Sequence, residues 1–141
     1  MRQVTQLLIL LTTLTLLTSC EGFKVLTIHN TSDHDVRVTV RPGIDSSDHR
    51  QINDYPNNQT PDSSMVILQP DSSMTVLSIF TGVMFNVKIK ERELRTDYIK
   101  IETPTDTVTA ASKKEIIDLI YTKRKGEIKG EGRNFATIKI E

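Results

Sequence analysis

Apolar and polar residues alternate strictly in two segments of this chain, and this period of two most constrains the fold. Residues 36–41 run Val-Arg-Val-Thr-Val-Arg, and residues 83–89 place an apolar side chain at every second position. Successive side chains of a strand point to opposite faces of a sheet. The alternation therefore predicts strands with one face on a core and the other in water.

Six further segments carry weaker strand patterns, rich in β-branched and other apolar residues. They are Phe23–His29, Met65–Gln69, Met74–Phe80, Tyr98–Glu102, Thr107–Ala111 and Phe135–Ile140. Seven or eight short strands predict a mainly β fold, a small β-sandwich of immunoglobulin-like architecture. The chain has one Cys and no Trp, so it lacks the Cys and Trp signature of true immunoglobulin domains.

Turn-forming residues separate these segments. Asn30-Thr31-Ser32-Asp33 predicts a hairpin turn, because Asn and Asp tolerate left-handed backbone and bond to their own main chain. Residues 43–64, rich in Asp, Asn, Ser and Pro, predict one long exposed loop. Pro-Asp-Ser-Ser-Met occurs at residues 61–65 and again at 70–74, which predicts two successive strands entered through similar turns.

One helix is expected near the C-terminus. Ser112 and Glu115 match a capping box, in which each side chain satisfies a free amide at the helix start. We expect the helix to end near Lys123, with Gly126 as its stop. Its apolar face consists of Ile116, Ile117, Leu119 and Ile120. Three Gly residues between positions 126 and 132 predict a mobile link to the last strand.

The N-terminus has the layout of a secretory signal. One basic residue, Arg2, precedes an apolar stretch from Leu7 to Leu17. A membrane-spanning helix needs roughly 20 predominantly apolar residues. We therefore expect a cleaved signal and no permanent transmembrane segment.

The end of this stretch, Leu17-Thr18-Ser19-Cys20, resembles the signal of bacterial lipoprotein precursors. Cys20 is the only Cys in the chain and has no internal partner for a disulfide. The resemblance implies cleavage before Cys20 and acylation of its sulfur. It divides the chain into a signal peptide at residues 1–19, an acylated Cys and short tether at residues 20–22, and one β-sandwich domain at residues 23–141.

The resemblance also implies a location. Several acyl chains hold a protein stably on a membrane, so we expect a lipid anchor in the bacterial cell envelope. A tether of about three residues spans roughly 10 Å and keeps the domain close to the bilayer. Glu21 stands alone and does not begin an acidic surface-export run. This favours an outer-membrane anchor with the domain in the periplasm; surface exposure is the alternative.

Composition excludes some partners. Eighteen Lys and Arg balance 18 Asp and Glu, so we expect no nucleic-acid partner. Without Trp, stacking on sugars is weakly supported. The basic run Lys123-Arg124-Lys125 suits anionic lipid or a polyanionic glycan, but we favour a solvated loop after the helix.

The sequence offers no catalytic or metal constellation. His29, His34 and His49 lack the converging spacing of a zinc site, and the Asp residues of the long loop lack the calcium-loop pattern. There is no nucleophile motif, phosphate loop or dinucleotide fingerprint. We therefore expect no cofactor and no enzymatic activity.

The mature domain loosely resembles small uncharacterised Bacteroidetes lipoproteins, through its Asn-Thr-Ser turn, Tyr55-Pro56 and Pro-led turns. No activity comes with that resemblance. We expect a non-enzymatic binding or accessory module for an envelope protein. Its expected recognition surface is the long loop, with Asp45, Asp48, His49 and Tyr55.

Two other functions remain open. The alternative is a structural subunit of an envelope complex or surface appendage that assembles through an exposed edge strand, Phe135–Glu141. A small hydrolase is the third hypothesis, which requires a pocket with convergent titratable groups.

Overall fold

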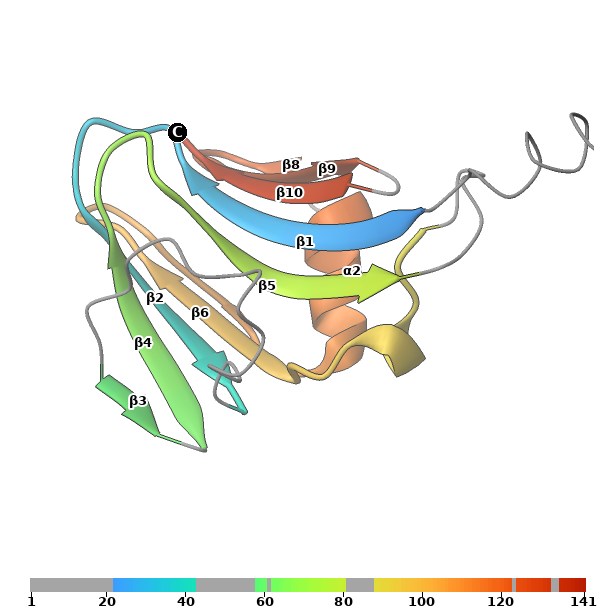
Figure 1. Ribbon diagram of the computed structural model, residues 1–141. Coiled ribbons are helices and arrows are strands. Elements are labelled where there is room, and N and C mark those ends of the chain that lie inside the picture. Colours follow the sequence, from blue (N-terminus) through green and yellow to red (C-terminus); the bar gives the residue numbers. More distant parts are fainter. Residues whose placement is uncertain (1–21, 43–57, 61, 81–87, 123, 133–134) are drawn as a thin grey trace, which may run out of the picture.

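A computed structural model describes residues 22–42, 58–60, 62–80, 88–122, 124–132 and 135–141 (Figure 1). The described residues form ten strands, one α-helix and a 3-10 helix. The strands are β1 (Phe23–Asn30), β2 (Val36–Arg41), β3 (Asn58–Thr60), β4 (Ser63–Leu68), β5 (Ser73–Phe80), β6 (Tyr98–Glu102), β7 (Thr107–Ala110), β8 (Arg124–Lys125), β9 (Ile128–Gly132) and β10 (Phe135–Ile140). The helices are η2 (Glu91–Glu93) and α2 (Lys113–Tyr121).

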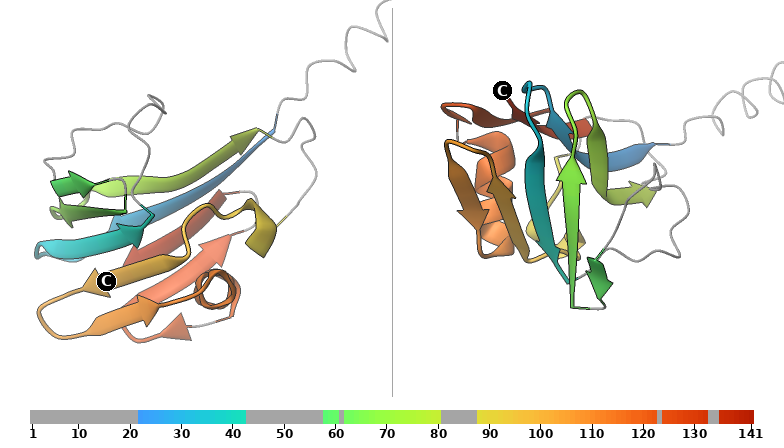
Figure 2. Two further views of the ribbon diagram at one scale, coloured as in Figure 1. Left: turned by 90° about the horizontal axis from the view of Figure 1, so that it is seen from below. Right: turned by 90° about the vertical axis from the view of Figure 1, so that its left-hand side faces the viewer.

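The strands form two packed sheets, so the expected mainly β sandwich with one short helix is confirmed (Figure 2). The first sheet has the order β5-β1-β10-β9-β8, and the second has the order β3-β4-β2-β6-β7. Strands β1 and β10 pair in parallel, and the other neighbours are antiparallel. Seven of the expected segments form strands, and β3, β8 and β9, of three, two and five residues, are additional.

The core lies between the inner faces of the two sheets. Alternation along β2 buries Val36, Val38 and Val40 completely, and alternation along β1 does the same for Leu26 and Ile28. Helix α2 packs against β9 and β10 of one sheet and against β6 and β7 of the other, and Figure 1 shows it spanning the space between them. Its buried residues are Ile116, Leu119 and Ile120.

The predicted capping box of α2 is present. The Ser112 hydroxyl accepts a hydrogen bond from the Glu115 amide at 3.2 Å, and the Glu115 carboxylate accepts one from the Ala111 amide at 2.7 Å. The helix ends at Tyr121, with Thr122 as its C-cap. The helix therefore ends two residues before Lys123, near which its end was expected.

The expected hairpin at Asn30–Asp33 is wrong, because β1 and β2 belong to different sheets. The turn residues are where the sequence placed them, but they carry the chain across the sandwich. The second Pro-Asp-Ser-Ser-Met turn likewise leads from β4 in one sheet to β5 in the other. Asp71 in that turn has a φ of 59°, a left-handed conformation that Asp tolerates. Turn-forming residues indicate that the chain reverses direction, but they do not indicate that the two strands they join pair with each other.

The mobile link expected between Gly126 and Gly132 is also wrong. These residues form the turn and second strand of the β8–β9 hairpin, with Gly126 at a φ of +52°. A Cβ on Gly130 would lie 2.2 Å from the Leu119 carbonyl oxygen and 2.4 Å from the Ile120 Cα. Glycine is required there because α2 packs directly on the backbone of β9.

Two other predicted segments differ. Asn58–Thr60 and Ser63–Leu68 form β3 and β4, so the long loop predicted at residues 43–64 is too long at its C-terminal end. Of the strand predicted at residues 83–89, positions 83–87 lie outside the described residues, and Lys88–Lys90 is not a strand. The Ile89 amide donates instead to the Tyr121 hydroxyl at 2.9 Å.

The last strand exists, but it is not an edge. β10 lies between β1 and β9, with Ala136, Ile138 and Ile140 buried. The expectation that Phe135–Glu141 offers an exposed edge is therefore wrong. An alternating pattern identifies a strand with one buried face, whereas its place in a sheet depends on which other strands pair with it.

Candidate functional site

The site residues predicted from the sequence lie outside the described part of the structure. They are the signal residues Leu17, Thr18 and Ser19, the acylation site Cys20, and the loop residues Asp45, Asp48, His49 and Tyr55. They stay predictions. The described residues show where the chain enters the fold, because β1 begins at Phe23.

We call the end of the sandwich where β1 begins the entry end. Strand β5 ends there, β10 begins there, and η2 lies beside them, on the right in Figure 1. The strand register agrees, since Phe23 pairs with Phe80 and Val25 pairs with Phe135.

An ion pair between the buried Lys24 and the partly buried Glu93 joins β1 to η2 at the entry end. Lys24 is on the inner face of β1 and only 3% exposed. Its ammonium donates to the two carboxylate oxygens of Glu93 at 2.7 and 2.9 Å, and the Lys90 amide donates to the same carboxylate at 2.8 Å. A buried charge needs such a partner, because an unpaired one is costly.

The surroundings of this ion pair shift the pKa values of Glu93 and Tyr121 in opposite directions. Partial burial acts to raise the pKa of Glu93, but the hydrogen bonds from Lys24 and Lys90 outweigh it and leave that pKa lowered. Burial raises the pKa of Tyr121, and the Glu93 carboxylate adds to the effect. Glu93 is thus charged and Tyr121 neutral at pH 7, and the bonds from Lys24 to the Glu93 carboxylate hold η2 against the sheet.

Three phenylalanines occupy the outer face of the first sheet at the same end. The rings of Phe23 and Phe80 meet edge to face, with centroids 5.5 Å apart. Phe80 is 57% exposed and Phe135, which pairs with Val25, is 68% exposed. Directly paired residues share a face of the sheet, so these side chains form one apolar surface, which we call the aromatic patch (Phe23, Val25, Phe80, Phe135).

Basic side chains surround η2. Lys88, Lys90, Arg92 and Arg95 are all exposed, and the Lys88 ammonium lies 5.0 Å from the centre of the Tyr121 ring. The acidic residues of the same segment are Glu91 and Glu93, and Glu93 is neutralised by Lys24. The segment from residue 88 to 95 therefore presents a net positive surface to solvent.

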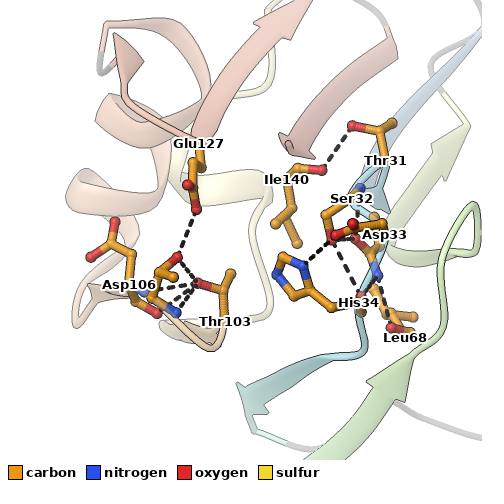
Figure 3. A network of polar contacts seen from close by, with 11 residues as sticks. Thr31, Ser32, Asp33, His34, Leu68, Thr103, Asp106, Glu127 and Ile140 are labelled. Atoms are coloured by element: carbon orange, nitrogen blue, oxygen red, sulfur yellow. Dashed lines mark hydrogen bonds and ion pairs between the residues drawn. The ribbon is translucent and has the colours of Figure 1, made fainter.

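A second polar cluster lies at the opposite end of β1 (Figure 3). The fully buried Asn30 amide donates to the carbonyls of His34 and Leu68 at 2.8 and 2.9 Å. Its carbonyl oxygen accepts from the amide and hydroxyl of Ser32 at 3.1 and 2.6 Å. Asn30 thereby satisfies every polar atom of its side chain and ties β4 to the turn between the sheets.

Asp33 and His34 adjoin this cluster. His34 Nδ1 lies 3.0 Å from an Asp33 carboxylate oxygen, and that hydrogen bond lowers the pKa of Asp33. The Ser32 hydroxyl bonds to Asn30 and to the His34 main-chain carbonyl and not to the imidazole. The three residues therefore do not form a nucleophile and base, and their contacts stabilise the turn.

Figure 3 also shows hydrogen bonds in the turn between β6 and β7. The Thr103 hydroxyl donates to the Asp106 carbonyl at 3.1 Å and accepts from the Asp106 amide at 2.8 Å. The Thr105 hydroxyl donates to Glu127 at 3.0 Å. These bonds close the β6–β7 turn and link it to the β8–β9 turn.

Within the described ranges, no group of three or more His, Cys, Asp or Glu side chains could hold a metal ion. Among those same residues, no helix is long and apolar enough to cross a membrane.

Comparisons of this chain with protein families, with curated proteins and with solved structures find no match. The site must therefore be judged on its own geometry. The aromatic patch was not found from the sequence, because its phenylalanines stand at positions 23, 80 and 135. Each begins or ends a predicted strand, which is a usable signal only when the pairing of the strands is known.

Proposed function

We propose that this protein is a lipid-anchored lipoprotein of the bacterial cell envelope, whose β-sandwich acts as a non-enzymatic binding or accessory module. The observation that carries the proposal is Leu17-Thr18-Ser19-Cys20 at the end of an apolar stretch. The start of β1 at Phe23 supports it, since a folded domain follows the acylation site directly.

The anchor is tested by the intact mass of the protein purified from its native membrane. The expected mass is that of Cys20–Glu141 plus acyl groups. The control is Cys20→Ser, which keeps the rest of the sequence and should yield neither acylation nor cleavage before position 20. The mass of an unmodified chain would contradict the proposal, because a domain without acyl groups has no lipid anchor.

The binding role is tested by cross-linking in native membranes. Asp45, Asp48, His49 and Tyr55 are changed together to Ser in the full chain, because a deletion reaching Asn58 would remove β3. Loss of a cross-linked envelope protein, with an unchanged unfolding midpoint, is the expected result. The matched control changes Asp62 and Asp71, two acidic residues exposed in turns. Identical cross-links from both variants would contradict a role for the loop.

The second candidate, a structural subunit, now requires a different strand. With β10 inside its sheet, the edges among the described strands are β5, β8, β3 and β7, and β5 is the longest of these at eight residues. Sedimentation of the purified mature protein over a wide concentration range tests this function. Assembly that grows with concentration supports it, whereas a monomer throughout contradicts it.

A further inference from the structure

We propose that the entry end of the sandwich rests on the bilayer itself, with the aromatic patch in the lipid interface and the basic residues around η2 at anionic headgroups. The proposal deepens the proposed function and rests on its lipid anchor. It assigns a membrane-binding surface to the folded domain, and it sets the orientation of that domain.

The position of the patch is the first argument. Phe23 is the first residue of β1, three positions after Cys20 in the sequence. Phe80 pairs with Phe23, and Phe135 pairs with Val25. An anchor at Cys20 therefore brings these exposed rings within reach of the lipid, since three residues span roughly 10 Å.

The polarity of the outer face is the second argument. Along the strands of the first sheet, its side chains change in order from the entry end to the opposite end. The apolar residues Phe23, Val25, Phe80 and Phe135 come first, with Ser78 beside Val25. Thr27, Thr75 and Thr137 follow, with Glu131 beside Thr137, and His29, Ser73, Lys129 and Lys139 come last. The outer face thus changes from a largely apolar end to a polar and charged end, as expected for a surface that meets a bilayer interface at one end and water at the other.

Exposure and charge are the third argument. Phe80 and Phe135 are two of the three exposed large hydrophobic side chains among the described residues. Large exposed apolar surfaces mark interaction sites, and apolar residues flanked by Lys and Arg are typical of interfacial binding to anionic lipid. Arg92 and Arg95 lie in and next to η2, which the Lys24–Glu93 pair holds beside β1. Charge complementarity therefore favours an anionic membrane over a second copy of this nearly neutral chain.

The absence of Trp from the sequence allows a direct test. Phe80→Trp and Phe135→Trp each introduce a single tryptophan, which can be excited apart from tyrosine, into the acylated mature protein reconstituted in phosphatidylethanolamine and phosphatidylglycerol vesicles. The matched control is Ile67→Trp, which replaces the third exposed hydrophobic residue, 48% exposed. Ile67 is near the end of β4, which a short turn joins to the start of β5, so it lies away from Phe80.

We expect brominated lipid to quench the Trp fluorescence of F80W and F135W several-fold more strongly than that of I67W. The Trp emission of F80W and F135W should also be shifted to the blue relative to that of I67W. Arg92→Glu with Arg95→Glu should weaken that quenching in anionic vesicles and leave the unfolding midpoint unchanged. Quenching of F80W and F135W no stronger than that of I67W would overturn the proposal. A blue shift that depends on protein concentration, without quenching by lipid, would also overturn it and identify a second copy as the occupant.

The intact mass of the same samples separates this surface from the anchor. Acylated protein without lipid quenching overturns the surface and leaves the anchor standing. Unacylated protein that is still quenched on anionic vesicles supports the surface and contradicts the anchor. Unacylated protein without quenching overturns both.

Discussion

Lys24 departs from the apolar pattern of its strand, and an ion pair compensates its buried charge. The alternation of β1 turns position 24 inward, beside Leu26 and Ile28, where an apolar side chain is the usual choice. The Lys24 ammonium is accommodated because Glu93 reaches it from η2. At the other end of the same face, Asn30 is buried with all its polar atoms bonded. Both residues exchange apolar contact for a specific link to a distant segment.

Replacement of Glu93 by Gln should remove the part of the pH dependence of stability that this carboxylate contributes. The folded pKa of Glu93 lies below its ordinary value of 4.5, so its stabilisation is fully present above that pH and is lost as pH falls through the folded pKa. We expect Glu93→Gln to cost about 2 kcal/mol at pH 7, and the difference from the parent to shrink below pH 4.5. Urea unfolding of both proteins at several pH values measures this difference in the free energy of unfolding. Glu91→Gln, at an exposed neighbour, is the control; a constant difference for E93Q at all pH values would contradict the prediction.

Asn30→Ala should be more costly than its small size suggests. It leaves the carbonyls of Leu68 and His34 without the donor that now satisfies them, so we expect a loss of about 3 kcal/mol in the free energy of unfolding. Ser32→Ala, which removes a single hydroxyl from the same cluster, should cost about 1 kcal/mol. Equal losses in urea unfolding would show that the Asn30 amide has no special role.

Helix α2 and strand β9 illustrate how elements depend on each other. The helix has its own signals, a capping box and an apolar face, and the sequence predicted it closely. Strand β9, Ile-Lys-Gly-Glu-Gly, has the composition of a linker, and it is a strand because β10 pairs with it and α2 covers it. Gly130 is the residue at which those contacts meet.

A methyl group at Gly130 should separate α2 from β9. We expect Gly130→Ala to lower the free energy of unfolding by about 3 kcal/mol, because the added Cβ meets backbone atoms that cannot rotate away. Gly126→Ala is the matched control: it has open space around it and should cost about 1 kcal/mol for its positive φ. Chemical denaturation of both proteins measures the difference, and a loss for G126A as large as for G130A would refute the packing explanation.

The two-sheet arrangement as a whole depends on pairings between distant segments. The first sheet joins β1, from the start of the domain, to β10, from its end, while β2 and β4 leave for the second sheet. The chain crosses between the sheets at the Asn30 turn and at the Asp71 turn, so neither sheet can form from one continuous stretch of sequence. The first and last strands of the domain, β1 and β10, therefore both lie inside the first sheet and not at its edges.

Removal of residues 133–141 should abolish the fold and not merely an assembly surface. The truncation takes away β10, whose two neighbours, β1 and β9, would lose their ladder. We expect a chain without dispersed amide signals in a ¹H–¹⁵N spectrum. Deletion of Glu141 alone is the control, because its ion pair with Lys129 is exposed and such pairs contribute about 0–1 kcal/mol. A dispersed spectrum from the shorter truncated chain would show that β10 is dispensable.

Local chemistry in the sequence determined the segments of seven strands (β1, β2, β4, β5, β6, β7 and β10), most of their bounds, and the helix with its cap. Side-chain periodicity and capping are properties of neighbouring residues. Local chemistry also supplied the expectation of a lipid anchor at Cys20. The tertiary structure alone decided that Asn30–Asp33 crosses between sheets, that β10 is internal and that residues 128–132 form a strand. It also brought Phe23, Phe80 and Phe135 together and placed Glu93 against Lys24. The reason is physical: pairing between strands depends on contacts between residues distant in the chain, and no local pattern specifies its own partner.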